Sequence, residues 1–469
     1  MYNFPSHNDA GKHRARHSAL EFERLLEQDS YHFIDLMKVE EIYNYYLFTN
    51  ELNKARFLIS YALQSHPTSS DLYYKQARID IELDNYESAL THIETALSYS
   101  PMQREYIFFQ AELLAQMDHY AAAQALLEEL LAYSVDQPEE ILLYLGNIAQ
   151  VCKQPADSEK YYRRALGLVP AYEEALFELA FLLEAEDKLS EALELYEQYL
   201  DDYPYSYEVW YNLGVLYRKS GNYEKAIEAL DYALLITEDF GPAYYAKGRL
   251  LLEQQQYEYA LQAFLHAHSL APNDLHTIYH LAECYENLEL YRDAIRYYFK
   301  ATEKDADYLD AWLGLGYCLE KQEKYLEAVY YYYHALKLDE ENEDICLSIA
   351  ICEYKLGNKH SAYLMLERAI QLKPGELAIW QDWAQLLFQH QNLDGARTYL
   401  LEGIKQNPAE ASLYYQYAAY SYHAGAYQDL LTFFENALLL KREDYYLLFH
   451  HAPELKKNQF ILDLIAQYS

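Results

Sequence analysis

Apolar residues recur three and four positions apart along almost the whole chain, in paired segments of about a dozen residues each. This spacing is typical of amphipathic helices with one buried face. Gly221, Gly357 and Gly425 lie between paired segments, where glycine accepts the positive φ that closes a helix tightly. Prolines such as Pro374 and Pro408 follow second segments and end them. The pattern therefore predicts a succession of antiparallel helix pairs.

The pairs repeat every 34 residues, because alanine returns at the same point of the cycle. Ser158 holds this point in one further unit, and the linker before that unit is one residue longer, at Pro138. Self-similarity at this period is typical of stacked repeats that cannot bury their apolar faces alone. The alanines are Ala55, Ala89, Ala123, Ala192, Ala226, Ala260, Ala294, Ala328, Ala362 and Ala396. The twelve predicted repeats begin at residues 36, 70, 104, 139, 173, 207, 241, 275, 309, 343, 377 and 411.

Small residues mark where the paired helices approach each other. Counting from Leu36 as position 1, position 8 is Gly or Ala in eleven repeats, with Tyr43 as the exception. Position 27 is usually Ala, and position 24 often holds a ring, as at Tyr162 and Phe264. Close packing of helices requires such an alternation of small and large side chains. These positions are therefore predicted to form the core.

The clearest repeat carries eight residues in phase with a known pattern: Trp210, Leu213, Gly214, Tyr217, Tyr223, Ala226, Leu230 and Ala233. On these residues the chain resembles the tetratricopeptide repeat family, whose pattern is W-x2-L-G-x2-Y followed by Y-x2-A-x3-F-x2-A and Pro. This repeat departs from the pattern where Leu230 replaces Phe and Glu238 replaces Pro. The resemblance covers residues 36–442 and extends to cytoplasmic bacterial proteins of this family. It implies an all-α fold, an α-solenoid in which antiparallel helix pairs form a right-handed superhelix.

The two ends of the chain fall outside the repeats. Residues 1–17 are polar and are predicted to be disordered. A capping helix is predicted to begin at Ser18 and, with a linker, to fill residues 18–35. Residues 443–469 are predicted to form C-terminal capping helices. The apolar residues expected on one face there are Leu455, Phe460, Ile461, Leu464 and Ile465.

The charge balance narrows the class of partner. With 74 acidic and 37 basic residues the formal net charge is −37, which argues against nucleic acid or an anionic membrane as the main partner. The 54 tyrosines exceed ordinary usage, and some are expected to form a binding surface. The five cysteines include no C-x-x-C pair, and no apolar stretch is long enough for a signal peptide or a membrane span. These features predict a cytoplasmic protein.

The resemblance also implies a candidate binding groove. In the tetratricopeptide family, positions 2, 5, 6, 9, 12 and 13 of the first helix line the inner groove. Aromatic rings there can bracket a peptide, and carboxylates can match its Lys or Arg side chains. Two alternatives stay open: the rings cover neighbouring repeats, or the arginines offset nearby glutamates. The candidate groove residues are Tyr74, Arg78, Phe108, Glu112, Phe177, Phe181, Tyr211, Arg218, Tyr245, Arg249, Tyr279, Glu283, Tyr317, Tyr354, Phe388, Tyr415 and Tyr422.

One group of residues has the spacing of metal ligands. His276, His280 and Glu283 lie at i, i+4 and i+7 of one predicted helix, and zinc accepts such ligands. The group is not an H-E-x-x-H motif, no fourth ligand is evident, and histidines at these positions also make ordinary hydrogen bonds. A metal-dependent module built on these residues is therefore an alternative to the leading hypothesis.

No phosphate-binding loop or nucleophile elbow interrupts the repeats. We therefore predict a non-catalytic protein–protein interaction scaffold with no cofactor and no metal. Its concave groove is expected to bind a peptide segment or helix of a partner protein that carries basic and apolar side chains. A self-assembling structural protein is a further alternative, since the sequence determines neither the oligomeric state nor the partner.

Overall fold

The chain is built from successive helices. The computed structural model describes residues 9–26, 33–133 and 137–468, and these ranges contain helices and no strand. The predicted all-α solenoid of helix pairs is confirmed. The chain divides into two compact units, Met1–Ala229 and Leu230–Ser469, and the boundary falls within α13 (Tyr223–Ile236).

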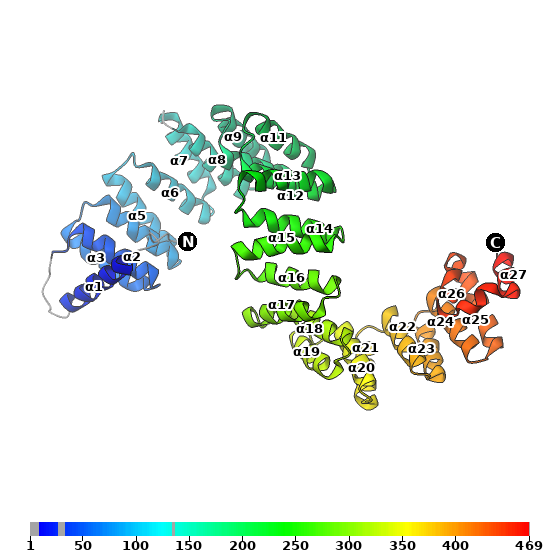
Figure 1. Cartoon of the computed structure of the whole chain (residues 1–469). Helices are drawn as coiled ribbons and strands as arrows, with labels where there is room; N and C mark the ends of the chain where they lie inside the picture. Colours follow the sequence, from blue (N-terminus) through cyan, green and yellow to red (C-terminus); the bar gives the residue numbers. More distant parts are fainter. Residues whose placement is uncertain (1–8, 27–32, 134–136, 469) are drawn as a thin grey trace. The chain divides into compact units, whose positions relative to one another are not determined.

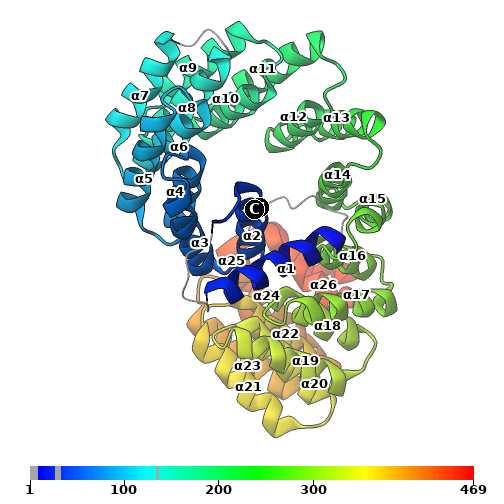
Figure 2. The same ribbon diagram turned by 90° about the vertical axis from the view of Figure 1, so that its left-hand side faces the viewer.

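In unit 1, each helix contacts the next one along the chain from α1 through α12 (Figures 1 and 2). The unit begins with α1 (Asp9–Leu26). The first helices of its repeats are α2 (Leu36–Phe48), α4 (Ser70–Glu82), α6 (Arg104–Gln116), α8 (Pro138–Val151), α10 (Glu173–Ala185) and α12 (Tyr207–Lys219). The second helices are α3 (Leu52–Ser65), α5 (Tyr86–Tyr99), α7 (Tyr120–Tyr133), α9 (Pro155–Leu168) and α11 (Leu189–Asp202).

Unit 2 has the same construction, with contacts between consecutive helices from α14 through α25 (Figure 1). Its first helices are α14 (Gly241–Glu253), α16 (Leu275–Asn287), α18 (Leu309–Lys321), α20 (Glu343–Lys355), α22 (Leu377–Gln389) and α24 (Ala411–His423). Its second helices are α15 (Tyr257–Leu270), α17 (Tyr291–Lys304), α19 (Tyr325–Leu338), α21 (Lys359–Leu372), α23 (Leu393–Gln406) and α25 (Tyr427–Lys441). First helices therefore begin where the sequence repeats begin, except that α8 begins at Pro138, one residue earlier, where proline suits the first helical position.

The N-terminal helix is longer than the sequence indicated. Helix α1 begins at Asp9, so residues 9–17, predicted to be disordered, are helical, while residues 1–8 lie outside the described ranges. Ala15 is buried together with Ala19 and Phe22, and Arg14 forms a 2.8 Å ion pair with Glu41 of α2. Burial of Ala15 and this ion pair with α2 explain why the helix extends beyond the predicted start at Ser18.

The C-terminal cap is broken into short pieces. It consists of η1 (Arg442–Tyr445), α26 (Tyr446–His451), η2 (Pro453–Lys457) and α27 (Gln459–Gln467). Leu455, Ile461, Leu464 and Ile465 are buried as expected. Phe460 is exposed, which corrects its assignment to the buried face. On α27, the residues Ile461, Leu464 and Ile465 share one face, and Phe460 lies at the edge of that face, where it projects into solvent.

The predicted core positions pack as paired small and large side chains. The ten alanines at position 20 are fully buried, as is Ser158, whose hydroxyl donates a hydrogen bond to the carbonyl of Gly146. In three repeats with glycine at position 8, the backbone there lies against the ring at position 24. A Cβ atom added at Gly316 would lie only 2.4 Å from Cε1 of Tyr332. A Cβ atom added at Gly146 would lie 2.3 Å from the ring of Tyr162, and one added at Gly248 would lie 2.8 Å from the ring of Phe264.

Substituting Gly316 by alanine is expected to lower the free energy of unfolding by about 1–3 kcal/mol, because the ring of Tyr332 must move. Thermal unfolding of purified variants measures this loss. Gly167→Ala is the matched control, since an added Cβ there meets no atom within 4 Å. The Gly316→Ala/Tyr332→Leu double variant is expected to recover part of the loss. Equal stability of the two alanine variants would contradict the packing argument.

The turn within each repeat uses a left-handed residue at position 15. Gly221, Gly357 and Gly425 have positive φ, as the sequence predicted. Nine non-glycine residues at the same position also have positive φ: Asn50, Asp84, Asp118, Lys153, Asp187, Gln255, Glu289, Glu323 and Gln391. A non-glycine residue in this conformation costs about 1–2 kcal/mol. The helix contacts of each repeat therefore maintain a turn that most of these residues do not favour by themselves.

Replacing Gln255, Glu289 and Glu323 together by glycine is expected to stabilise unit 2 by about 0.5–1 kcal/mol per site. Glycine relieves the energetic cost of the left-handed backbone. It also gives the unfolded chain more conformational entropy, and this offsets part of the gain in stability. Differential scanning calorimetry would record it as a higher unfolding temperature. Gln254→Gly serves as the control, because Gln254 has φ −85° and should lose stability instead. A lower unfolding temperature for the triple variant would refute the expectation.

Candidate binding surface

Two hollows lie between successive first helices of unit 1. The Arg104 hollow encloses about 360 Å³, and the Glu178 hollow encloses about 390 Å³. The Arg104 hollow is lined by Tyr74 of α4, by Arg104, Glu105, Phe108, Phe109 and Glu112 of α6, and by Gln137, Glu140 and Tyr144 at α8. The Glu178 hollow is lined by Phe177, Glu178, Ala180, Phe181 and Glu184 of α10, Tyr196 of α11, and Asn212, Val215 and Leu216 of α12. Both hollows therefore combine aromatic rings with carboxylates.

The Arg104 hollow already contains a cation from the chain. The guanidinium of Arg104 lies 5.6 Å from the ring centre of Phe108, and its Nη2 donates to Oε2 of Glu140 at 2.9 Å. The same guanidinium donates to the side-chain and backbone oxygens of Gln137. Phe108 also stacks with Tyr144, the ring centres 4.3 Å apart. Within this hollow, Arg104 thus contacts both the ring of Phe108 and the carboxylate of Glu140.

The Glu178 hollow has similar walls but a different charge pattern. Phe177 and Phe181 lie one helical turn apart on α10, so both project from one face, and Phe181 is 60% exposed. The edge of Tyr196 packs against Phe177. Glu184 forms an ion pair with Lys219, whereas Glu178 has no hydrogen-bond or ion-pair partner among the described residues. One carboxylate in this hollow is therefore without a cation.

Burial changes the acidity of several carboxyl groups on this side of the repeats. Loss of hydration raises the pKa of Glu112 above its ordinary 4.5, although a hydrogen bond from Tyr144 partly opposes the rise. The same cause raises the pKa of Glu178, of Glu286 on α16 and of Asp382 on α22. Each group is therefore harder to ionise than it would be in the unfolded chain.

Lowering the pH from about 7.5 to about 4.5 is accordingly expected to stabilise the wild type relative to a Glu112→Gln/Glu178→Gln variant, while the lowered pKa values of His268 and His451 act in the opposite direction in both proteins. Between the ordinary and the raised pKa, the folded state binds more protons than the unfolded chain, so the cost of buried ionised carboxyls disappears on acidification. Scanning calorimetry of both proteins across this range measures their unfolding temperatures. The difference in unfolding temperature between the wild type and the variant should shift in favour of the wild type as the pH falls. A difference that stays constant, or that shifts in favour of the variant, would contradict this expectation.

The structure distributes the predicted groove residues unevenly. Five of them line the two hollows: Tyr74, Phe108, Glu112, Phe177 and Phe181. Tyr415 is fully buried against Phe434 and donates to the carbonyl of Lys441, so a partner cannot reach it in this structure. Phe108 and Tyr354 are also buried, although Phe108 still forms a wall of its hollow. The remaining candidates, partly or well exposed, are Arg78, Tyr211, Arg218, Tyr245, Arg249, Tyr279, Glu283, Tyr317, Phe388 and Tyr422.

Some of these exposed side chains pack on neighbouring residues. Arg78 lies over the ring of Tyr74, and a carboxylate oxygen of Glu253 lies 4.0 Å from Arg249. Phe388 stacks on Tyr420, with the ring centres 4.4 Å apart. The alternative in which these groups cover neighbours or offset nearby charges therefore holds for part of the set.

The residues considered as metal ligands do not converge. Nδ1 of His280 lies 2.8 Å from Oε2 of Glu283, and the His280 ring stacks on Phe264. His276 instead contacts the edge of Tyr308. Over the described ranges, no three His, Cys, Asp or Glu side chains are placed to hold one ion. The geometry of a metal-dependent module at these residues is therefore not formed.

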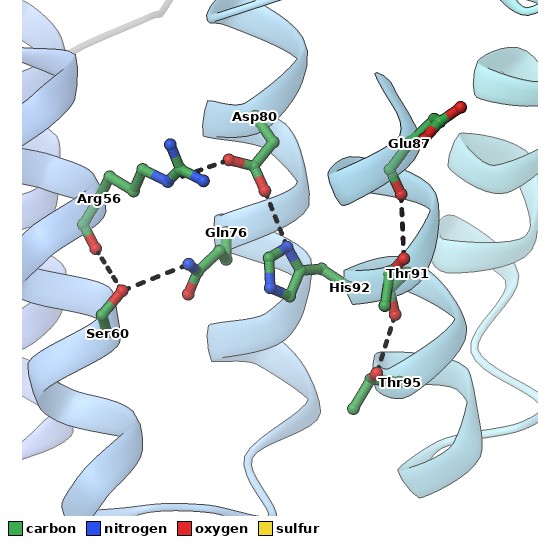
Figure 3. Close-up of polar contacts among 8 residues, drawn as sticks. All are labelled: Arg56, Ser60, Gln76, Asp80, Glu87, Thr91, His92 and Thr95. Carbon is green, nitrogen blue, oxygen red and sulfur yellow. Dashed lines mark hydrogen bonds and ion pairs between the residues drawn. The ribbon is translucent and has the colours of Figure 1, made fainter. Parts of the chain in front are cut away.

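The sequence did not single out several lining residues and one buried polar cluster. Tyr144 and Glu184 occupy groove positions 6 and 12, so their repeat positions could have identified them as lining residues. In the cluster, the fully buried Asp80 of α4 lies between Arg56 of α3 and His92 of α5 (Figure 3). Asp80 occupies position 11, which is apolar in most repeats, and this mismatch was its signal.

These features define the class of protein, an α-solenoid of repeated helix pairs with ring-lined hollows between first helices. Family profiles described as tetratricopeptide repeat match residues 153–207, 183–250, 241–274 and 279–343. These parts of the chain therefore carry tetratricopeptide repeats, as the sequence resemblance indicated. Such repeats generally serve as non-catalytic protein–protein interaction scaffolds.

Solved structures of the same class are similar to parts of the chain. YrrB, described as a TPR protein with an unusual peptide-binding site, is 20% identical over 40% of this chain and 96% of its own, with a TM-score of 0.37. A tetratricopeptide repeat protein from Parabacteroides merdae is 18% identical over 53% of this chain and 98% of its own, with a TM-score of 0.38. MamA from Desulfovibrio magneticus is 22% identical over 36% of this chain and 94% of its own, with a TM-score of 0.34. No curated protein matches the chain.

Among the helices that the structure describes, none combines the length and the apolar character required to cross a bilayer.

Proposed function

We propose that this protein binds a peptide segment or helix of a partner protein on the face formed by its first helices. The observation that supports this proposal is the pair of hollows in unit 1, where exposed or half-buried rings lie beside carboxylates. Rings of this kind gain most from contact with apolar side chains and with the stems of long basic ones. The proposed ligand is therefore a segment that carries both.

Charge favours a basic segment over an acidic one. The formal net charge of −37 attracts cationic ligands over distances comparable with the Debye length and repels anionic ones. Glu112 and Glu178 place part of this charge inside the hollows, where screening by salt is weaker. The general field would set the rate of encounter, and the hollows would set the position of the bound segment.

The test compares two triple variants of equal charge. Glu112, Glu178 and Glu283 on first helices are changed to lysine in one variant, and Glu94, Glu194 and Glu303 on second helices are changed to lysine in the other. Short random peptides are selected on the full chain, and the affinity of a selected peptide is measured by fluorescence anisotropy.

The first variant is expected to weaken binding about tenfold or more beyond the second. Equal weakening would mean that net charge alone attracts the peptide, and the first-helix face would then have no special role. Circular dichroism of both variants controls for folding.

A further inference from the structure

The two hollows of unit 1 share an aromatic residue at one repeat position and differ in charge at another. Phe108 and Phe177 both occupy position 5, on α6 and α10. Position 1 is Arg104 in the first case and Glu173 in the second. Arg104 reaches back over Phe108, whereas Glu173 accepts a hydrogen bond from the hydroxyl of Tyr199 at 3.0 Å. The Glu178 hollow therefore lacks the arginine that its counterpart has.

The environment of Glu178 favours a cation from outside. This carboxylate is half-buried beside Phe177, and the described residues offer it no hydrogen bond or ion pair. The lining residues include no Lys or Arg, and the other carboxylate of the lining, Glu184, is paired with Lys219. Because the fold has removed part of the water around Glu178, an incoming cation gains attraction at a smaller further desolvation cost.

We infer that the Glu178 hollow binds an arginine side chain of the partner segment, through the same combination of an aromatic ring and a carboxylate that Arg104 contacts in the neighbouring hollow. The guanidinium would lie over the ring of Phe177 or Phe181 and pair with Glu178. Arginine suits this position better than lysine because its planar group stacks on rings and forms directed hydrogen bonds to carboxylates. This inference rests on the proposed function and names the side chain that the first-helix face recognises.

The hollow has the room and the openness that this role requires. Its volume of about 390 Å³ is slightly larger than that of the Arg104 hollow, which has its own arginine at its wall. Phe181 is 60% exposed, so it leaves apolar surface that an arginine stem would cover. Asn212 of α12 adds a polar group to the lining that could accept a further guanidinium hydrogen bond.

The experiment is a double-mutant cycle on the full chain. Peptides selected from a random library on the wild-type protein are aligned, and the arginine they share is replaced by citrulline, which keeps the shape and removes the charge. Affinities of both peptides are measured for the wild type, for Glu178→Gln and for Glu194→Gln. Glu194 is exposed on α11, so its variant changes the net charge equally outside the hollow.

Citrulline is expected to weaken binding to the wild type and to Glu194→Gln by about tenfold to a hundredfold, and to change binding to Glu178→Gln by less than about threefold. An equal citrulline effect in all three proteins would overturn the inference, as would selected peptides without a shared arginine. In both cases the proposed function stands if Phe181→Ala still abolishes binding. Failure to select any peptide, or insensitivity of every peptide to Phe181→Ala, would contradict the proposed function as well.

Discussion

Replacement of Trp383 by alanine is expected to lower the free energy of unfolding of the repeats around α22 by about 3–5 kcal/mol. Trp383 is fully buried, and its ring meets the rings of Tyr354, Tyr363 and Tyr399 edge-on, with centres 5.4 to 6.3 Å apart. Removal of so large a ring leaves a cavity that the rigid helix pairs around it can fill only in part. No other single truncation in unit 2 is expected to cost more.

The loss should be local, because each repeat of a solenoid contacts only its neighbours. Hydrogen exchange followed by mass spectrometry is expected to show faster exchange in α20 to α24 and unchanged exchange in α4 to α8. Trp383→Phe is the control: the indole N–H has no hydrogen-bond partner, so phenylalanine loses volume but no bond. An alanine variant as stable as the phenylalanine variant would contradict the assignment of Trp383 to the core.

Substitution of Arg56 by methionine is expected to destabilise the first two repeats by about 2–3 kcal/mol. Asp80 is fully buried, with Nε of Arg56 3.2 Å from one carboxylate oxygen and Nδ1 of His92 2.7 Å from the other (Figure 3). The Arg56 contact is ionic, since it lacks the alignment of a hydrogen bond. Without Arg56, most of the compensation for a buried charge is lost.

Substitution of the carboxylate partner should lower the free energy of unfolding by less than substitution of Arg56 does. Asp80→Asn leaves Arg56 and His92 without their carboxylate, but both are partly exposed and can be hydrated. Chemical denaturation of Arg56→Met, Asp80→Asn and the double variant gives the coupling energy of the pair. Additive losses, or a larger loss for Asp80→Asn than for Arg56→Met, would show that Asp80 does not depend on Arg56.

The sequence predicted those parts of the fold in which a repeat position requires one kind of residue. Alanine at position 20 and small residues at position 8 are buried where the helices of a pair meet, and at Gly146, Gly248 and Gly316 even an added Cβ atom would meet the facing ring. The left-handed turn at position 15 was predicted only where glycine marks it. At Glu289 or Lys153 the same turn is imposed by packing, which the propensity of the residue does not reveal.

For the candidate site, the sequence predicted which repeat positions face the groove, but not which of their side chains are accessible. Position 5 is aromatic in both Phe177 and Tyr415, but the C-terminal segment covers Tyr415 and leaves Phe177 beside a hollow. The presence of Arg104 in its hollow was not predictable either. Arg104 lies outside the groove positions, and only its long side chain reaches the hollow. Coverage and side-chain direction depend on neighbouring repeats, so the repeat pattern alone does not determine them.

The central claim, that the partner lies on the first-helix face at the Glu178 hollow, has a direct test in site-specific photocross-linking. The photoreactive residue benzoylphenylalanine is placed at Phe181 on α10 in one protein and at Tyr133, exposed at the end of α7, in another. Each protein is irradiated with the selected peptide, and mass spectrometry locates the adducts. We predict peptide adducts at position 181 and none at position 133; adducts at position 133 with none at position 181 would contradict the account.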